Sequence, residues 1–173
     1  RRKNVADAQP NEAHFALAEL QNDFDVHIIT QNIDDLHERV GSKNVLHLHG
    51  EIFKMRSEAN EQLIYPIYDE IKIGDRAEDG AQLRPHIVWF EEAVPMIEPA
   101  VELMKRAEVF LIVGTSLVVY PAAGLVNYTP WEIPKFIVDK KIPYTSSLYN
   151  LTTIEKPATE GMIELKEKLK AFK

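Results

Sequence analysis

The stretch from Thr30 to Gly50, TQNIDDLHERVGSKNVLHLHG, is rich in side chains that can take part in chemistry. It carries three of the six histidines of the chain, together with three carboxylates and two asparagines. Short apolar runs at 26–29 and 45–48 have the composition of buried strands. Polar side chains beside buried strands indicate a site, either for a metal ion or for a polar organic cofactor.

A metal site would use the three histidines of this stretch, His37, His47 and His49. His47 and His49 are two positions apart, so on an ideal strand their imidazoles would lie on one face and reach one ion. His37 and Asp34 could complete the ligand set. The pattern therefore leaves open a metal-dependent hydrolase, and for His49 taken alone an ordinary structural role at the end of a strand.

Strands and helices alternate along the rest of the chain, which predicts parallel strands joined by helical crossovers. Asn11, after Pro10, is suited to cap a helix whose apolar positions 13, 16, 17 and 20 follow helical spacing. Further strands are predicted at 87–90, 109–113 and 136–138, and helices at 96–107, from 121 onward, and over a final segment with Met162, Leu165, Leu169 and Phe172 on one face.

Three polar loops should share one edge of such a sheet, because ligands gather at the carboxyl ends of parallel strands. These loops are 30–35, 49–50 and 114–116. In the last, Gly114 would permit close approach of a ligand to the backbone, and Thr115 and Ser116 offer hydroxyl and N–H groups suited to ribose or phosphate oxygens.

Composition narrows the classes of function. With 173 residues, of which 45% are hydrophobic, the chain can form one domain with a core and a small insertion. A net charge of −7 argues against nucleic-acid binding, which needs a dense basic surface. The absence of cysteine excludes disulfides and thiolate-bound zinc and is typical of a reducing compartment, so we expect a cytoplasmic protein.

The uncharged run 109–131 is long enough to span a bilayer, but it is interrupted by glycine, proline and polar residues. We therefore expect a buried strand, a loop and a helix there, and no membrane association. The chain starts without Met or an apolar leader, so no secretory signal is expected, although the N-terminus is expected to be truncated.

Four blocks, in this order, resemble the core motifs of the sirtuin family of NAD-dependent protein deacylases. They are TQNIDDLHERVG, LHLHGE, RPHIVWFEE and VGTSLVVYPAAG, spread from Thr30 to Gly124, and QPNEAHFALAEL and ATEGMIELKEKL are similar to bacterial members. The resemblance implies a Rossmann-like α/β fold, a parallel sheet flanked by helices, formed by residues 1–50 and 85–173. Residues 51–84 would form a small inserted module.

The same resemblance implies roles for individual residues. His49 would be the catalytic base, with Asn32 and Asp34 assisting. NAD would be bound by Gln31, Asn32, Asp34, Gly114, Thr115 and Ser116, and at the adenosine end by Asp139 and Ala158. The family usually has Asn where Asp139 stands. Val88 and Phe90 would flank the acyl-lysine of a protein or peptide substrate, and Arg1 or Arg2 would bind an acidic acyl group such as succinyl.

In the family reaction, the acyl oxygen of the substrate attacks the ribose as nicotinamide leaves. A histidine then helps to deprotonate a ribose hydroxyl, a task suited to a side chain that titrates near neutrality. The products would be nicotinamide, free lysine and acyl-ADP-ribose. His37 and His47 would have supporting roles.

Three departures from the family pattern affect these expectations. The family's four zinc cysteines are absent, so we expect no zinc and a module core built instead from apolar residues: Leu63, Ile64, Tyr65, Ile67, Tyr68, Ile71 and Ile73. Glu91 replaces a usual Gly beside the substrate cleft. The Gly-rich nucleotide loop and the strand before it are not in the sequence, so NAD binding by this chain alone is expected to be weak.

The sequence thus predicts an NAD-dependent protein-lysine deacylase, either a deacetylase or a desuccinylase. The alternatives are a truncated or degenerate sirtuin-like binding module without activity, mono-ADP-ribosyl transfer in the same pocket, and the metal-dependent hydrolase. The oligomeric state is not predicted.

Overall fold

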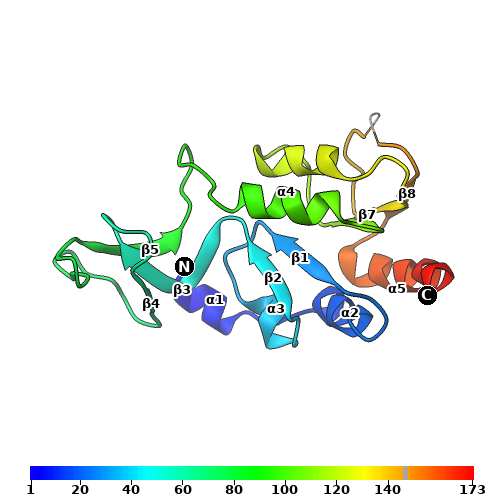
Figure 1. Cartoon of the computed structure of the whole chain (residues 1–173). Coiled ribbons are helices and arrows are strands. Elements are labelled where there is room, and N and C mark those ends of the chain that lie inside the picture. Colours follow the sequence, from blue (N-terminus) through cyan, green and yellow to red (C-terminus); the bar gives the residue numbers. More distant parts are fainter. Residues whose placement is uncertain (146–147) are drawn as a thin grey trace.

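A computed structural model describes residues 1–145 and 148–173. Its parallel strands fall into two sheets. In the first, β1 (His27–Thr30) pairs with β2 (Asn44–His47), and the short helix α3 (Leu36–Arg39) connects them. In the second, β7 (Lys135–Asp139) lies between β6 (Phe110–Val113) and β8 (Leu151–Glu155). The predicted α/β class, with parallel sheets flanked by helices, is confirmed (Figure 1).

The helix α2 (Glu12–Leu20) begins where the sequence predicts. The Asn11 side-chain oxygen accepts hydrogen bonds from the backbone N–H groups of Ala13 (3.0 Å) and His14 (3.4 Å), and His14 Nδ1 accepts from the Asn11 N–H. This reciprocal arrangement satisfies donors that a helix N-terminus otherwise leaves free.

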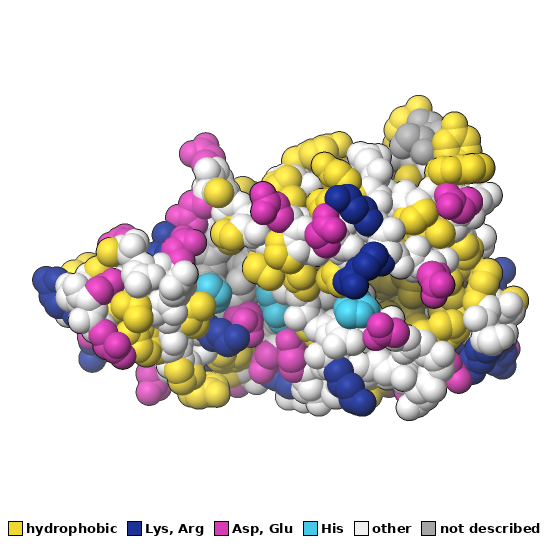
Figure 2. Space-filling model, in the orientation of Figure 1, with side chains coloured by type: hydrophobic (Ala, Val, Ile, Leu, Met, Phe, Trp, Pro, Cys, Tyr) yellow, Lys and Arg dark blue, Asp and Glu magenta, His cyan; other side chains and the backbone are white. Residues whose placement is uncertain are grey.

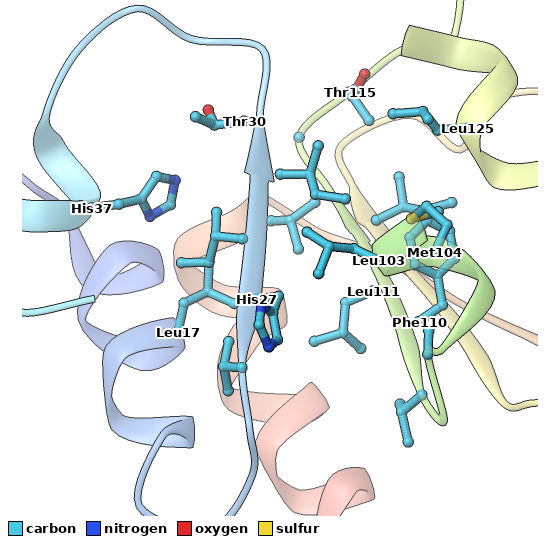
Figure 3. A pocket seen from close by; sticks show the side chains of 18 of the residues that line it. Leu17, His27, Thr30, His37, Leu103, Met104, Phe110, Leu111, Thr115 and Leu125 are labelled. Atoms are coloured by element: carbon cyan, nitrogen blue, oxygen red, sulfur yellow. The ribbon is translucent and has the colours of Figure 1, made fainter. Parts of the chain in front are cut away.

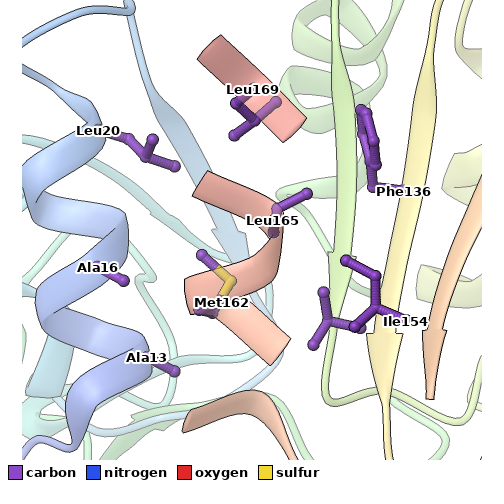
Figure 4. Close-up of a cluster of buried hydrophobic side chains, with 9 residues drawn as sticks. Ala13, Ala16, Leu20, Phe136, Ile154, Met162, Leu165 and Leu169 are labelled. Carbon is purple, nitrogen blue, oxygen red and sulfur yellow. The ribbon is translucent and has the colours of Figure 1, made fainter. Parts of the chain in front are cut away.

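Helix α5 (Ala158–Leu169) lies between α2 and the strands of the second sheet (Figure 4). Buried residues from these elements form one apolar cluster: Ala13, Ala16 and Leu20 of α2, Phe136 and Val138 of β7, Ile154 of β8, and Met162, Leu165 and Leu169 of α5. Gly161 permits close packing, because a Cβ there would lie 2.3 Å from Val138 Cγ1. A second cluster joins α4 (Ile97–Lys105) and the 3₁₀ helix η1 (Ala122–Tyr128) to Leu48.

The uncharged run 109–131 contains β6, a loop and η1, as expected for a buried strand, loop and helix. Within the described residues, no helix is both long and apolar enough to cross a membrane. Strand β8 was not predicted. Its sequence, LTTIE, is short and has one fully buried apolar side chain, Ile154, so it carries little hydrophobic signal.

The antiparallel sheet has the order β4-β3-β5, with β3 (Gly50–Ser57), β4 (Ile64–Pro66) and β5 (Leu83–Ile87). The strand predicted at 87–90 as part of the parallel series is wrong. The strand ends at Ile87, the Val88 N–H donates to the His49 carbonyl at 2.9 Å, and the chain then turns. The short helices α1 (Arg2–Asp7) and η2 (Lys170–Phe172) complete the described structure.

The apolar core predicted for the inserted segment is also wrong. Ile64, Tyr68 and Ile73 are exposed, with Ile73 fully open to solvent. The buried residues of this sheet are Gly50, Ile52, Ser57, Leu83 and Ile87. Ser57 Oγ donates to Asp79 Oδ2 at 2.6 Å and accepts from the N–H groups of Ala59 and Asn60, both at 3.1 Å. A buried hydroxyl that satisfies three partners therefore organises the turn after β3.

Candidate active site

His49 lies in the turn between β2 and β3, and its ring is held by one backbone contact. Its Nδ1 is 2.9 Å from the Gln31 carbonyl oxygen. A carbonyl only accepts hydrogen bonds, so Nδ1 carries the proton in this arrangement. In the neutral ring the lone pair is then on Nε2, which is the atom left to act as a base.

The loop after β1 meets the loop after β6 through side chains. Gln31 Nε2 donates to Thr115 Oγ1 at 3.3 Å, and Thr30 Oγ1 accepts from the Asn32 N–H at 3.1 Å. Asp34 Oδ1 accepts from the Leu36 N–H at 3.1 Å at the start of α3, which leaves its other oxygen without a hydrogen-bond partner in the described residues. Residues from three separate loops are thereby brought to one edge, as the sequence predicts.

The three histidines of the metal hypothesis are in three different environments. His47 Nε2 is 2.7 Å from Glu38 Oε1, and its Nδ1 is 3.4 Å from the Asn32 carbonyl. The His37 ring packs against His14, with centroids 4.8 Å apart. Strand β2 ends at His47, so the chain turns before His49 and the two rings do not share a strand face. No group of three or more potential ligands in the described residues is arranged to hold a metal ion, so the metal-site interpretation is wrong.

A cavity of about 1220 Å³ lies between the two parallel sheets and opens at this edge (Figure 3). Gln31 and Asn32 line it from the first sheet, and Gly114, Thr115 and Ser116 line it from the second. Gly114 has a φ of +62°, and a Cβ there would meet nothing within 4 Å, so the backbone is open to a ligand. Ala158, at the N-terminus of α5, also lines the cavity, whereas Asp139 does not.

The residues predicted to hold the substrate follow β5. Val88 is tied by its N–H to the His49 carbonyl, and the Phe90 side chain is 94% exposed. Arg2 donates from Nε to the Ile52 carbonyl at 2.9 Å and from Nη1 to the Asp69 carbonyl, so its guanidinium is already engaged. Arg1 is exposed. Of the two arginines, Arg1 is therefore the one that is available to a ligand.

The sequence did not predict the pair of Arg84 and Glu92, which shapes the loop after β5. Arg84 donates to both carboxylate oxygens of Glu92, at 2.8 and 3.0 Å, and Glu92 Oε2 also accepts from the Trp89 N–H at 2.9 Å. The exposed carboxylates of this loop are among the magenta side chains of Figure 2. The hydrogen bonds from Arg84 hold the pKa of Glu92 below its ordinary value. Glu91 has a φ of +72°, a conformation that favours glycine. The eight-residue spacing of Arg84 and Glu92 gives no periodic signal.

The fold and this edge are typical of a nucleotide-binding α/β protein, with a histidine placed between its loops. Comparison with known proteins makes the assignment specific: the model of the Sir2 family matches residues 1–121, and the chain belongs to that family.

Its relatives include two bacterial proteins named NAD-dependent protein deacylase. One, from Bacteroides thetaiotaomicron, is 46% identical, and the match covers 98% of this chain and 75% of the relative. The other, from Helicobacter pylori, is 45% identical, with 98% and 74% covered.

Solved structures of similar fold include complexes with ligands. A Sir2 homologue in complex with NAD has a TM-score of 0.82 and 34% identity, covering 97% of this chain and 68% of that one. A Sir2 protein bound to an acetylated peptide has a TM-score of 0.80 and 31% identity, covering 95% and 73%.

Proposed function

We infer that the protein is an NAD-dependent protein deacylase, which transfers the acyl group of an acyl-lysine to ADP-ribose and releases nicotinamide. The observation that carries this inference is the placement of His49. Its Nδ1 is fixed by the Gln31 carbonyl, and Gln31 in turn contacts Thr115 on the opposite loop. The base and the two cofactor loops are therefore connected by hydrogen bonds.

The donors at this edge fit NAD. The open backbone at Gly114 and the hydroxyls of Thr115 and Ser116 suit ribose and phosphate oxygens, and the amides of Gln31 and Asn32 suit the nicotinamide end. Bound NAD supplies an electrophilic ribose carbon, nicotinamide as the leaving group and a ribose hydroxyl. We propose Ala158 for the adenosine end, and Asp139 only as a flanking residue, because it does not line the cavity.

The protein's own groups have distinct tasks in this reaction. His49 Nε2 accepts a proton from a ribose hydroxyl, and the Gln31 carbonyl stabilises the resulting imidazolium through Nδ1–H. Asp34, whose second carboxylate oxygen has no hydrogen-bond partner in the described residues, would stabilise positive charge on the ribose, and Asn32 would help to position it. No nucleophilic side chain is needed, since the acyl oxygen of the substrate attacks.

We propose that an acyl-lysine peptide lies along the loop after β5. The N–H of Val88 is bonded to the His49 carbonyl, so this loop is tied directly to the base, and exposed Phe90 offers an apolar wall for the lysine stem. Exposed Arg1 would bind a carboxylate on the acyl group, which would favour succinyl-lysine. We further propose that residues 1–50 with 85–173 act as the NAD-binding part, that 51–84 form a zinc-free module, and that the protein works in the cytoplasm.

The test is nicotinamide release from NAD with acetyl-lysine and succinyl-lysine peptides. We expect His49→Ala to lower kcat at least a hundredfold, the usual contribution of a general base. Ile163→Ala is the control, because this exposed residue of α5 does not line the cavity. Arg1→Ala should reduce turnover of the succinyl peptide more than that of the acetyl peptide.

Two outcomes would contradict these proposals. Retained turnover in His49→Ala would remove His49 from the mechanism. NAD binding by the wild-type protein without nicotinamide release would favour the non-catalytic binding module.

A further inference from the structure

A tight turn follows β5. The Glu92 N–H donates to the Trp89 carbonyl at 3.2 Å, so residues 89–92 form a β-turn with Phe90 and Glu91 at its two central positions. Glu91 has a φ of +72°, whereas Phe90 is not among the residues with positive φ. A positive φ at the second central position alone is the type II pattern, in which that position favours glycine. Glu91 is therefore a carboxylate at a position where a side chain costs conformational free energy.

Side-chain and backbone contacts hold this turn in place. Glu92 Oε2 accepts from the Trp89 N–H at 2.9 Å, which closes the turn a second time, and Arg84 binds both oxygens of the same carboxylate. Just before the turn, the Val88 N–H donates to the His49 carbonyl at 2.9 Å. The turn is thus fixed relative to His49. A strained conformation persists where surrounding contacts over-determine it, and such positions are frequent at binding sites.

The charge of Glu91 is not neutralised by a neighbour. Glu91 makes no salt bridge in the described residues, whereas Glu92 pairs with Arg84 at 2.8 Å. Its side chain is exposed, and residues 85–104 contain no lysine or arginine. The loop that carries it stands out from the body of the molecule between β5 and α4 (Figure 1). A full negative charge is therefore presented to whatever lies along this loop.

The fold itself does not use this side chain. The hydrogen bonds of the turn are made by backbone groups and by Glu92, so glycine in place of Glu91 would form the same turn with less strain. What the glutamate adds at this position is a negative charge. Such a charge attracts a basic partner and repels an acidic one.

We propose that Glu91 is a specificity residue, which selects acyl-lysine peptides that carry arginine or lysine close to the acylated position. This inference rests on the proposed function, which places the peptide along the same loop. Val88 and Glu91 are three positions apart, so their Cα atoms are separated by at most about 11 Å. An extended peptide covers that distance in about three positions. Arginine should be preferred over lysine, because a guanidinium binds a carboxylate through two parallel hydrogen bonds.

The test measures the binding of fluorescent acetyl-lysine peptides to the full chain by anisotropy, without NAD. The peptides differ only in having arginine, alanine or glutamate at one position within three of the acetyl-lysine. At one such position or more, we expect the arginine peptide to bind about fivefold more tightly than the alanine peptide, the upper range for an exposed ion pair. The glutamate peptide should bind more weakly than both. Salt at about 0.5 M should reduce the preference to less than about twofold.

Variants at the same position separate charge from shape. Glu91→Gln keeps the size of the side chain and the strain of the backbone but removes the charge, so it should bind the arginine and alanine peptides equally. Glu91→Lys should reverse the order and favour the glutamate peptide. Glu98→Gln is the matched control, because Glu98 is an exposed carboxylate in the first turn of α4. This variant should retain the wild-type preference.

Equal binding of the arginine and alanine peptides by the wild type at every position, or no binding of any peptide, would overturn the proposal. A preference that Glu91→Gln retains would also overturn it, and a lower urea midpoint of unfolding in this variant would assign the carboxylate to the fold. Binding is measured independently of turnover. An arginine preference that depends on Glu91, in a protein that releases no nicotinamide, would support the specificity residue and contradict the proposed deacylase activity.

Discussion

His14 and His37 form a pair of imidazoles that pack at a tilt of 50° behind the candidate site. Burial lowers the pKa of both rings, and for His37 the charge of His14 lowers it further. Asp34 acts in the opposite direction on both, but desolvation is the larger effect. His37 Nδ1 is buried and has no hydrogen-bond partner in the described residues. The folded protein therefore holds both rings neutral at neutral pH.

This pair predicts a pH dependence of stability. Between the lowered pKa of the folded rings and the ordinary value near 6.5, the unfolded chain binds more protons, so the free energy of unfolding falls as pH falls through this range. Above about pH 6.5 the stabilisation is fully present. Urea unfolding of the wild type and of His14→Gln/His37→Gln over this range is the measurement. The free energy of unfolding should depend less on pH in the double variant than in the wild type. Equal pH slopes for the two proteins would contradict the prediction.

In the turn after β3, the hydroxyl of Ser57 stabilises a segment for which the sequence predicts an apolar core. Ser57 is fully buried and satisfies three partners. We expect Ser57→Ala to destabilise the fold by about 1–3 kcal/mol, because it removes the hydrogen bond to the Asp79 carboxylate and the acceptor of two backbone N–H groups. Ser42→Ala is the matched control, since the buried Ser42 hydroxyl has no partner in the described residues. Equal thermal unfolding of the two variants would show that the Ser57 contacts are not stabilising.

The loop after β5 depends on Glu92 for its shape. Glu92 joins Arg84 to the Trp89 N–H, so it positions the residues between them, including Val88 and Phe90. Glu92→Gln removes the charge that strengthens these bonds, and we expect KM for the acyl peptide to rise about fivefold. The KM for NAD should not change. Glu98→Gln, an exposed carboxylate in the first turn of α4, is the control. A change in kcat alone would argue against a positioning role.

Local signals explain which of these features can be read from sequence. The Asn11 cap and the periodic face of α2 predict the helix, and the β-branched runs predict β1, β6 and β7, because capping and burial leave a pattern in neighbouring residues. The contacts of Ser57 with Asp79 and of Arg84 with Glu92 join residues 22 and 8 positions apart and leave no such pattern. The prediction that His47 and His49 share a strand face is wrong for a related reason. Whether the two side chains share a face depends on where β2 ends.

At the scale of the whole molecule, α5 is one of the elements that join the two parallel sheets, and α4 with η1, which pack against Leu48, is another. The apolar cluster around it includes residues of α2, which packs beside the first sheet, and of β7 and β8 in the second. Lys166 of α5 also pairs with Glu19 of α2, and Lys173 pairs with Asp23 at 2.5 Å. Because β1 and β6 are not paired with each other in the described structure, the two parallel sheets are joined through apolar clusters of this kind, one of which is built around α5.

Met162 lies at the centre of that contact, with no solvent exposure, between Ala13 of α2 and Ile154 of β8 (Figure 4). Met162→Ala removes a buried side chain that both halves contact, and we expect it to cost about 2–5 kcal/mol in the free energy of unfolding. Ile163→Ala is the matched control on the same helix, because Ile163 is 67% exposed and its truncation should change stability by no more than about 0.5 kcal/mol. Urea unfolding followed by circular dichroism measures both. If α5 joins the two parallel sheets, Met162→Ala should lower the urea midpoint of unfolding for the whole chain in a single transition. If only part of the circular dichroism signal is lost at lower urea, the two sheets are stable independently of the helix.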